Sequence, residues 1–296
     1  MKLDNKKIFE IYNDNQHLTR QEKADLCNEY FGTNYSESAF RKRYATYKSA
    51  VNDERLWLLD EDKKPLDRVV GVFSDVHLPF DHPRYLDFII DTFIEWGVTD
   101  IVCCGDLVDN HSISRHQTET MAMGGLTEYQ QAYNTMRKYI KAFPKLKLTL
   151  GNHDLIPQRQ AATLQLGGNY IKSFSEIWDL PKEWEIGESF VIDNVLYNHY
   201  GSGKDGAINR ALTERMSCVT GHTHSWANVK YSANERDVIF GMNVGCGIDN
   251  EAYAFAYGKM ARYKPNIACG IVKSSKEAYV VLMGDKYFRS NQDGTN

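Results

Sequence analysis

Five short polar motifs recur along the chain, and each one comes directly after a short apolar run. They are Asp75-Val-His77, Gly105-Asp106-Leu-Val-Asp109, Gly151-Asn152-His153-Asp154, His199, and Gly221-His222-Thr-His224. Apolar runs of this length predict buried strands. Glycine before Asp106, Asn152 and His222 permits a sharp turn away from the strand. Because residues beyond the carboxyl ends of strands in an α/β sheet converge on one crevice, these motifs predict a single shared site.

The spacing of apolar residues predicts strands that alternate with helices. In the first half, strands are expected at 69–74, 100–104 and 146–150. Helices are expected from Pro83, with Leu86, Ile89, Ile90 and Phe93 on one face and an end at Gly97, and from the capping sequence Thr127-Glu-Tyr-Gln130 to Pro144. In the second half, strands are expected at 190–192, 195–198, 217–220, 238–243, 268–273 and 278–283. Asp193-Asn194 between the first two of these predicts a hairpin turn.

The sequence pattern of residues 1–50 predicts three short helices. Thr19-Arg-Gln-Glu22 forms a capping box for the second helix, and Ser36 after the turn at 32–35 caps the third. Helix, turn and basic helix resemble a helix-turn-helix, so we expect nucleic-acid contact through Arg41, Lys42, Arg43 and Lys48. A docking module or an inert packed segment, with these charges on a solvated face, remains the alternative.

Length and composition limit the class of protein. A chain of 296 residues fits one large and one small domain, and we expect a helix-turn-helix-like segment at 1–50, a charged linker at 51–67 and a large domain at 68–296. The formal charge of −4 excludes a uniformly basic nucleic-acid coat. Neither a membrane-spanning run nor an apolar signal segment is expected, and the six scattered cysteines indicate reduced thiols, so a cytoplasmic protein is predicted.

The motifs together supply seven nitrogen and oxygen donors: Asp75, His77, Asp106, Asn152, His199, His222 and His224. This is too many for one tetrahedral zinc ion and suits two adjacent cations that share a bridging carboxylate. Imidazole and carboxylate donors without thiolates favour Mn²⁺, with Fe, Zn, Co or Ni as alternatives, over Ca²⁺. Polar loops that merely satisfy one another are the competing interpretation.

The four complete blocks Asp-x-His, Gly-Asp-x-x-Asp, Gly-Asn-His-Asp and Gly-His-x-His resemble those of the calcineurin-like metallophosphoesterase superfamily, over residues 69–287. The sequence from Gly105 to Arg115 is similar to forms common in phage-encoded members. This resemblance implies a mixed α/β fold, a β-sandwich of two mixed sheets flanked by helices, to which this chain adds a small N-terminal all-α segment.

The resemblance also implies a role for each site residue. Asp75, His77 and His224 would hold one metal ion; Asn152, His199 and His222 would hold the other; Asp106 would bridge them. His153 would remain unligated, face the substrate and protonate the departing oxygen, and Asp109 would orient its ring. The alternative for Asp109 is a loop or helix cap.

The implied activity is metal-dependent hydrolysis of a phosphoester by a metal-bridging hydroxide. Protein serine/threonine phosphatases of the superfamily carry Arg-Gly after the second Asp and Glu after Gly-Asn-His. Here Asn110-His111 and Asp154 occupy those places, which disfavours a protein phosphatase. We expect the substrate to be a phosphodiester in DNA or in a nucleotide. We expect the protein to be of phage type and to act in a bacterial cytoplasm. A nucleotidase or small-phosphate phosphatase, and a DNA-binding regulator with a non-catalytic metal domain, are the alternatives.

Three loops are expected around the crevice, at 110–126, 155–189 and 245–266. Arg115, His111 and Arg159 are candidate substrate-binding residues, because a guanidinium grips phosphate with two parallel hydrogen bonds. Pairing of Arg115 with an acid is the alternative. Aromatic and basic residues interleave in the third loop, which suits either nucleic-acid contact or an ordinary core.

Overall fold

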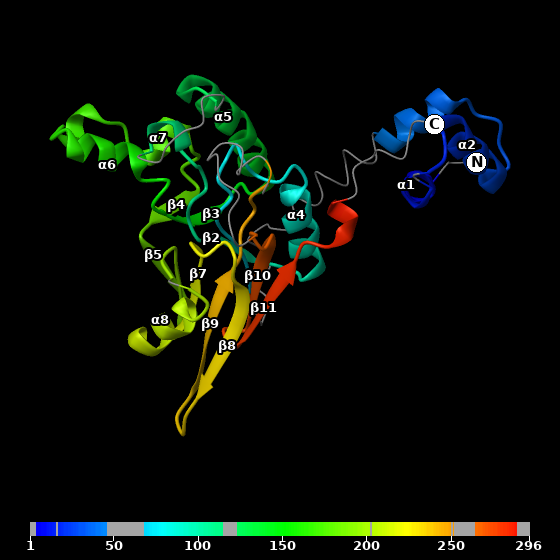
Figure 1. The fold of residues 1–296 in the computed structure, drawn as a ribbon. Coiled ribbons are helices and arrows are strands. Elements are labelled where there is room, and N and C mark those ends of the chain that lie inside the picture. Colours follow the sequence, from blue (N-terminus) through cyan, green and yellow to red (C-terminus); the bar gives the residue numbers. More distant parts are fainter. Residues whose placement is uncertain are drawn as a thin grey trace. The chain divides into compact units, whose positions relative to one another are not determined.

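The computed structural model describes residues 4–15, 17–45, 68–114, 123–201, 203–249, 251 and 264–288. The chain divides into two compact units, and Figure 1 shows both. The described residues 4–45 belong to a helical unit, and residues 68–288 belong to an α/β unit. No described helix has both the length and the apolar character needed to cross a membrane.

The helical unit contains α1 (Asn5–Asp14), α2 (Arg20–Phe31) and a further helical stretch at 37–45. The Thr19 side chain accepts a hydrogen bond from the backbone of Glu22, whose carboxylate accepts one from Thr19 in return, so the predicted capping box is confirmed. Gly32 ends α2 in a left-handed conformation. The three helices bury a small core of Ile8, Tyr12, Ala24, Cys27 and Phe40.

The first sheet of the α/β unit has six strands in the order β11-β10-β1-β2-β3-β4. They are β1 (Val69–Phe73), β2 (Asp100–Cys103), β3 (Leu146–Thr149), β4 (Trp184–Gly187), β10 (Ala268–Lys273) and β11 (Glu277–Leu282). The four strands β1 to β4 run parallel, and β10 and β11 add an antiparallel edge beside β1. The carboxyl ends of the parallel strands therefore meet at one edge of the sheet.

The second sheet has five strands in the order β5-β6-β7-β9-β8. They are β5 (Ser189–Ile192), β6 (Val195–Asn198), β7 (Ser217–Thr220), β8 (Ala227–Ala233) and β9 (Val238–Val244). The strands β6, β7 and β9 are parallel, and β5 and β8 pair antiparallel at the two edges. The hairpin between β5 and β6 turns through Asp193 and Asn194, with φ of 49° and 62°, as their sequence predicted.

The two sheets face each other across the main core. Val70 and Val72 of β1 lie in the same apolar cluster as Val219 of β7 and Met242 of β9. Since successive side chains of a strand alternate between faces, the next residue, Phe73, points the other way. Its ring packs against Tyr139 and Phe143 at centroid distances of 6.1 and 5.6 Å.

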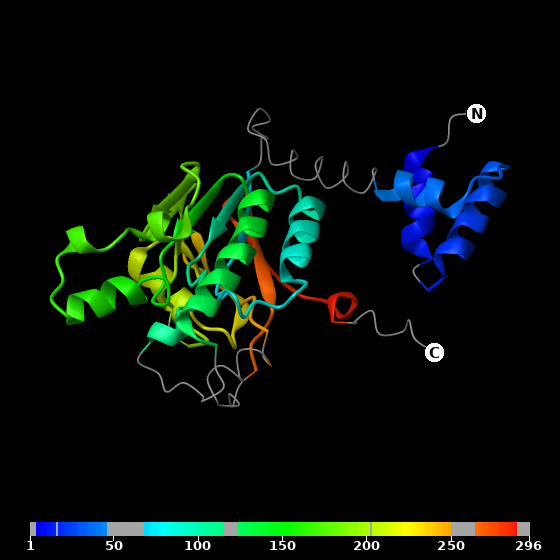
Figure 2. The same ribbon diagram turned by 90° about the horizontal axis from the view of Figure 1, so that it is seen from above.

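Helices cover the outer faces of both sheets (Figure 2). The helices α4 (Tyr85–Glu95) and α5 (Gly125–Ala142) lie outside the six-stranded sheet, and α8 (Gly206–Glu214) packs on the five-stranded sheet through Ala211. The shorter elements are η1 (His111–Ile113), α6 (Ile156–Thr163), η2 (Gly168–Tyr170), α7 (Phe174–Trp178) and η3 (Asp285–Tyr287). The predicted fold class, two mixed sheets flanked by helices with an N-terminal helical segment, is confirmed.

Three predictions of local structure need correction. Residues 155–189 do not form a simple loop, because they contain α6, α7 and β4, and Trp178 and Trp184 are buried in the unit. The helix α5 begins at Gly125, before the expected capping sequence. The helix α4 buries Phe88 and Thr92 together with Ile89 and Phe93, so its inner face is rotated from the predicted one, and Leu86 and Ile90 are only partly buried.

Candidate metal centre

Sharp backbone turns deliver the motif residues to the site. Asp75, His77, Asp106 and His222 have φ values of 52°, 53°, 49° and 70°, a left-handed conformation that is uncommon in residues other than glycine. Asp75 and His77 follow β1, Asp106 follows β2, and His222 follows β7. Each chain segment therefore leaves its strand at a tight angle, and each side chain turns toward the same edge of the fold.

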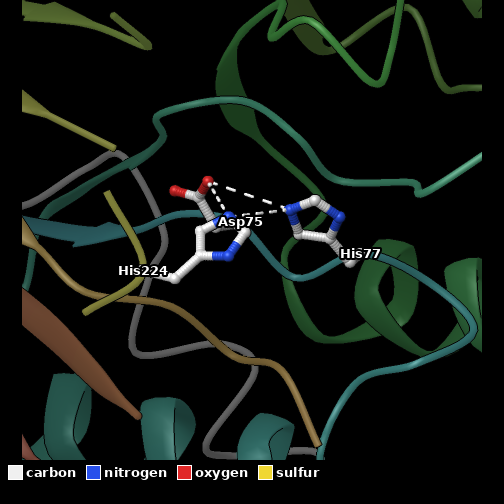
Figure 3. A group of neighbouring side chains, drawn as sticks. All are labelled: Asp75, His77 and His224. Atoms are coloured by element: carbon white, nitrogen blue, oxygen red, sulfur yellow. Dashed lines mark hydrogen bonds and ion pairs between the residues drawn. The ribbon is translucent and has the colours of Figure 1, made fainter. Parts of the chain in front are cut away.

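The first group consists of Asp75, His77 and His224 (Figure 3). Nε2 of His77 and Nε2 of His224 lie 3.2 Å apart. Oδ1 of Asp75 lies 3.1 Å from Nε2 of His224 and 3.9 Å from Nε2 of His77. One atom of each side chain thus faces a common point. The carboxylate is held in place through Oδ2, which accepts hydrogen bonds from Ser74 Oγ and from the backbone N–H of His222.

The second group contains Asp106, His199 and His222, with Asn152 beside them. Nε2 of His199 lies 3.1 Å from Oδ2 of Asp106, 3.2 Å from Oδ1 of Asn152 and 3.2 Å from Nδ1 of His222. The ring of His222 is exposed to solvent, whereas His199 is fully buried. This group is therefore open on the side of His222.

Asp106 lies between the two groups. Its Oδ2 atom is 3.1 Å from Nε2 of His199 and 3.8 Å from Nε2 of His77. Its other oxygen, Oδ1, accepts a hydrogen bond of 2.7 Å from the backbone N–H of His153. The carboxylate is thus oriented by the Asn152-His153 loop while one oxygen faces both groups. Asp106 is therefore shared by the two groups through this one oxygen.

The hydrogen bonds of two imidazoles turn a ring nitrogen of each toward the site. Nδ1 of His77 donates to Oδ1 of Asp109 at 2.6 Å, and Nδ1 of His199 donates to the carbonyl of Cys104 at 2.7 Å. In the neutral ring the proton on Nδ1 leaves a lone pair on Nε2, which here points into the site. Oδ1 of Asp75 is buried and accepts no hydrogen bond within the part of the chain that the structure describes. When these rings are neutral, their Nε2 atoms and the carboxylate oxygens can serve together as ligands of divalent cations.

The electrostatics of the site also favour cations. Burial raises the pKa of the Asp75 carboxyl, but the adjacent imidazoles of His224 and His77 outweigh it and hold the pKa well below its usual range. Burial lowers the pKa of His199, yet the charge of Asp106 dominates and raises it to about 9. The buried carboxylates therefore draw positive charge to the imidazoles, and metal binding would release those protons.

His153 and Asp109 lie beside the first group. Nδ1 of His153 is 2.8 Å from the backbone oxygen of Asp109 and 3.2 Å from its Oδ1 atom. The ring of His153 meets that of His77 edge to face at 4.5 Å. His77, Asp109 and His153 also satisfy the distance condition for a metal-binding group, but the contact of 2.6 Å between Asp109 and His77 is a short hydrogen bond. We interpret these three residues as a hydrogen-bonded relay rather than a third ion site.

Two further acids hold the motif loops: Asp154, which the sequence predicted to orient its loop rather than to contact substrate, and Glu128, which it did not single out. Asp154 is fully buried, and its two oxygens accept hydrogen bonds from the backbone N–H groups of Gly151 and Val108 at 2.9 and 3.1 Å. Glu128 of α5 accepts from the backbone of His111 and Ser112 at 2.6 and 2.8 Å. The position of Asp154 directly after Gly-Asn-His indicated its importance in the sequence, whereas no sequence pattern indicated Glu128.

The candidate substrate-binding residues lie in different surroundings. His111 is buried, with only 1% of its surface exposed, so its ring is not at the rim of the site. Arg159 is exposed, and its Nη2 donates to the hydroxyl of Tyr200 at 3.2 Å. Arg115 lies outside the described residues, as do most of the aromatic and basic residues expected at 245–266.

In the helical unit, Arg41, Lys42 and Arg43 are exposed, and Arg41 pairs with Glu37. Lys48, the fourth predicted nucleic-acid contact, and the expected linker at 51–67 lie outside the described residues.

Several solved structures are similar to this chain, each at low sequence identity. The chain is similar to Vacuolar Protein Sorting 29 from Cryptosporidium parvum (9% identity, TM-score 0.38, covering 74% of this chain and 98% of that chain). It is also similar to a metallophosphoesterase from Sphaerobacter thermophilus (14%, 0.38, 74% and 88%) and to the nuclease MPE of Pseudomonas putida (13%, 0.31, 72% and 87%). The comparison with curated proteins found no match.

Two family models match the sequence. Residues 8–57 match the YonJ N-terminal domain, and residues 68–247 match the calcineurin-like phosphoesterase model. The second match spans more than half of the chain and includes every motif from Asp75 to His224. The chain therefore belongs to the calcineurin-like phosphoesterase family of metal-dependent phosphoester hydrolases, which typically bind two divalent cations.

Proposed function

We propose that this protein hydrolyses a phosphodiester, in DNA or in a nucleotide, with two divalent cations held by the seven motif residues. The observation that carries the proposal is the convergence of imidazole nitrogens and carboxylate oxygens around Asp106, whose Oδ2 faces imidazoles of both groups. In this assignment Asp75, His77 and His224 hold one cation, and Asn152, His199 and His222 hold the other. Asp106 is shared between them.

Imidazole, carboxylate and amide donors favour Mn²⁺ as the natural cation. The clusters found among the described residues contain no cysteine. When bound, the two cations supply Lewis-acid activation of water and neutralise the charge of the phosphoryl oxygens. The protein residues fix the positions of the cations and orient the substrate between them.

His153 is the proposed general acid. Its Nδ1 atom is engaged by the backbone oxygen of Asp109, so Nε2 is the ring nitrogen left to carry a proton to the departing oxygen. The side chain of His153 is 11% exposed and lies beside the first ligand group. Asp109 is a positioning residue, because its carboxylate lies against Nδ1 of both His77 and His153.

The preference for a diester, and for DNA, is supported by charge outside the centre. Arg41, Lys42 and Arg43 are exposed on one helical stretch of the N-terminal unit, where they can bind phosphates of a nucleic acid without reading its sequence. We propose that this unit binds DNA and that the α/β unit hydrolyses it.

A substrate panel tests the proposal. The full chain, loaded with Mn²⁺ and with its ion content measured, is incubated with bis-p-nitrophenyl phosphate, p-nitrophenyl phosphate, mononucleotides, and single- and double-stranded DNA. We expect diesters and DNA to be hydrolysed faster than monoesters, and the matched variant Asp106→Asn to be inactive with reduced ion content. Faster hydrolysis of monoesters would identify a phosphomonoesterase instead. Absence of hydrolysis with two bound ions would favour a non-catalytic metal domain.

A further inference from the structure

On the open side of the second ligand group lie a tyrosine and an arginine that the proposed catalytic steps do not use. Tyr200 directly follows His199, and its side chain is 45% exposed. Its ring lies 5.0 Å from the ring of His199 and 5.8 Å from that of His222. Tyr200 therefore covers the outer edge of these two imidazoles at the place where the group opens to solvent.

Arg159 lies on the far side of the Tyr200 hydroxyl. Its Nη2 donates to Tyr200 Oη at 3.2 Å, and the residue is exposed. In the described part of the chain, Arg159 has no carboxylate partner. A guanidinium has five N–H donors in a planar fork, and a single neutral phenol leaves most of them available. Such a group is suited to a phosphate supplied by the substrate.

The helix that carries Arg159 is fixed to the catalytic loops. Ile156 N–H, at the start of α6, donates to the carbonyl of His153 at 3.1 Å. The side chain of Gln160 donates to the carbonyl of Ile113 in η1 at 2.9 Å. The position of Arg159 is thus tied to the same loops that hold the proposed general acid and Asp109. A rigid support of this kind is what accurate placement of a phosphate ligand requires.

We propose that Arg159 binds a second phosphate of the substrate, next to the phosphate that is cleaved, and that Tyr200 positions the guanidinium for it. This inference rests on the proposed function. The Tyr200 ring lies beside the rings of His199 and His222, and its hydroxyl contacts the Arg159 guanidinium. One side chain, Tyr200, therefore separates the guanidinium from the ligand groups. The cations hold the scissile phosphate, and Arg159 takes its neighbour. A neighbouring phosphate occurs in a nucleic-acid strand and in a nucleoside polyphosphate.

The test compares substrates with and without a second phosphate. The Mn²⁺-loaded full chain is assayed with the p-nitrophenyl ester of thymidine 5′-monophosphate, with single-stranded oligothymidylate and with ATP. Arg159→Gln should raise KM for the substrate that uses the second phosphate, and its kcat/KM should fall about tenfold or more beyond any loss on the single-phosphate ester. A selective loss on oligothymidylate would show that the second phosphate belongs to a nucleic-acid strand, and a selective loss on ATP would show that it belongs to a nucleoside polyphosphate. Ion content should not change.

Tyr200→Phe separates positioning from packing, because it keeps the ring on His199 and His222 and removes only the hydroxyl. We expect a smaller loss in the same arm, expressed in KM, and no additional loss when Tyr200→Phe is combined with Arg159→Gln. If oligothymidylate is the substrate, the dependence of log KM on log salt should become shallower by about one phosphate contact in Arg159→Gln. Arg210 is an exposed arginine that pairs with Glu214 on α8, and Arg210→Gln is the matched control. It should change KM and kcat/KM for none of the substrates.

Equal losses on the single-phosphate and multi-phosphate substrates would overturn the inference, as would full additivity of the two substitutions or loss of bound ions in Arg159→Gln. These outcomes leave the proposed function standing. Failure of the wild-type protein to hydrolyse any of the three substrates, with two ions bound, would instead overturn the proposed function itself.

Discussion

Oδ1 of Asp109 lies 2.6 Å from Nδ1 of His77, although the two residues come from the ends of different strands, β2 and β1. Both side chains are fully buried. The carboxylate fixes the proton on Nδ1 of His77 and therefore directs the lone pair of Nε2 toward Asp75 and Asp106. This contact connects the Gly-Asp-x-x-Asp motif to the Asp-x-His motif.

Replacing Asp109 by Asn should weaken metal binding. The amide accepts a weaker hydrogen bond from His77, so we expect the affinity for the first cation to fall about 10- to 100-fold, while the second is retained. Titration of the apoprotein with Mn²⁺, followed by elemental analysis, measures this change. Asp87→Asn, at an exposed carboxylate on α4, is the matched control and should bind both ions normally. Unchanged affinity in Asp109→Asn would assign this carboxylate to a loop cap.

His153→Gln should separate catalysis from metal binding. Because its ring is a proposed proton donor and not a ligand, the variant should keep two ions per chain and lose about 10²- to 10⁴-fold in kcat. The loss should be smaller for a p-nitrophenyl ester, whose leaving group needs little protonation, than for DNA. Ion content and kcat measured on the same preparation test this. His17→Gln, an exposed histidine of the helical unit, should change neither value. Loss of an ion would show that His153 is a ligand.

The strands that carry the motifs could be predicted from sequence with little error. Each is a short buried run that leads into a polar motif, and the observed strands β6 and β7 have the expected bounds, 195–198 and 217–220. The convergence of the motif side chains also follows from chain direction, because parallel strands bring their carboxyl ends to one edge. The hairpin at Asp193-Asn194 was predictable because both residues tolerate a left-handed backbone.

Features that depend on distant partners could not be predicted. The edge strands β4 and β8 have few fully buried residues, so they lack the apolar run that marks the other strands. The inner face of α4 is set by Tyr85, whose hydroxyl donates to the carbonyl of Ala268 in β10. At the start of α5, Glu128 accepts hydrogen bonds from the backbone of η1, and the helix already begins at Gly125, before the predicted capping sequence. The contact between Arg159 and Tyr200 likewise joins two segments with no shared sequence pattern.

The basic residues of the helical unit should contribute to DNA binding only. Replacing Arg41, Lys42 and Arg43 together by Gln should lower the affinity for DNA and reduce the slope of log K against log salt by about 0.9 for each lost duplex phosphate contact. All three side chains are exposed, so the fold should be retained. Fluorescence anisotropy with labelled duplex measures the slope, and hydrolysis of bis-p-nitrophenyl phosphate serves as the internal control. An unchanged slope would favour the docking-module interpretation of this unit.

The contact between β9 and α8 should be intolerant of any added side chain. A Cβ atom at Gly241 would overlap the backbone of Ala207 and Ile208, and a helix backbone cannot move aside as a side-chain end can. We expect Gly241→Ala to lower the free energy of unfolding by about 1–3 kcal/mol or more, measured by urea denaturation. Gly284→Ala is the control, because a Cβ there meets nothing within 4 Å. It should be neutral or slightly stabilising.

Asp81 should make the stability of the α/β unit depend on pH. Burial raises the pKa of this carboxyl to about 7, and the nearby charge of Asp249 adds to the effect, although a hydrogen bond from the Tyr139 hydroxyl opposes it. In the unfolded chain the pKa of Asp is about 3.9. The native state therefore binds more protons between these values, and the stabilising contribution of protonated Asp81 is complete below about pH 4 and lost as pH rises through about 7.

Asp81→Asn keeps a neutral side chain of the same shape at every pH, so it should remove this dependence. Relative to wild type, the variant should gain stability between pH 5 and pH 8, by on the order of 1 kcal/mol. Urea denaturation of the metal-free protein at the two pH values measures the difference, since bound cations would add their own pH dependence. Asp87→Asn, at an exposed carboxylate, should show no such gain. An equal response of Asp81→Asn and wild type to pH would mean that the Asp81 carboxyl is already ionised in the native state at pH 5.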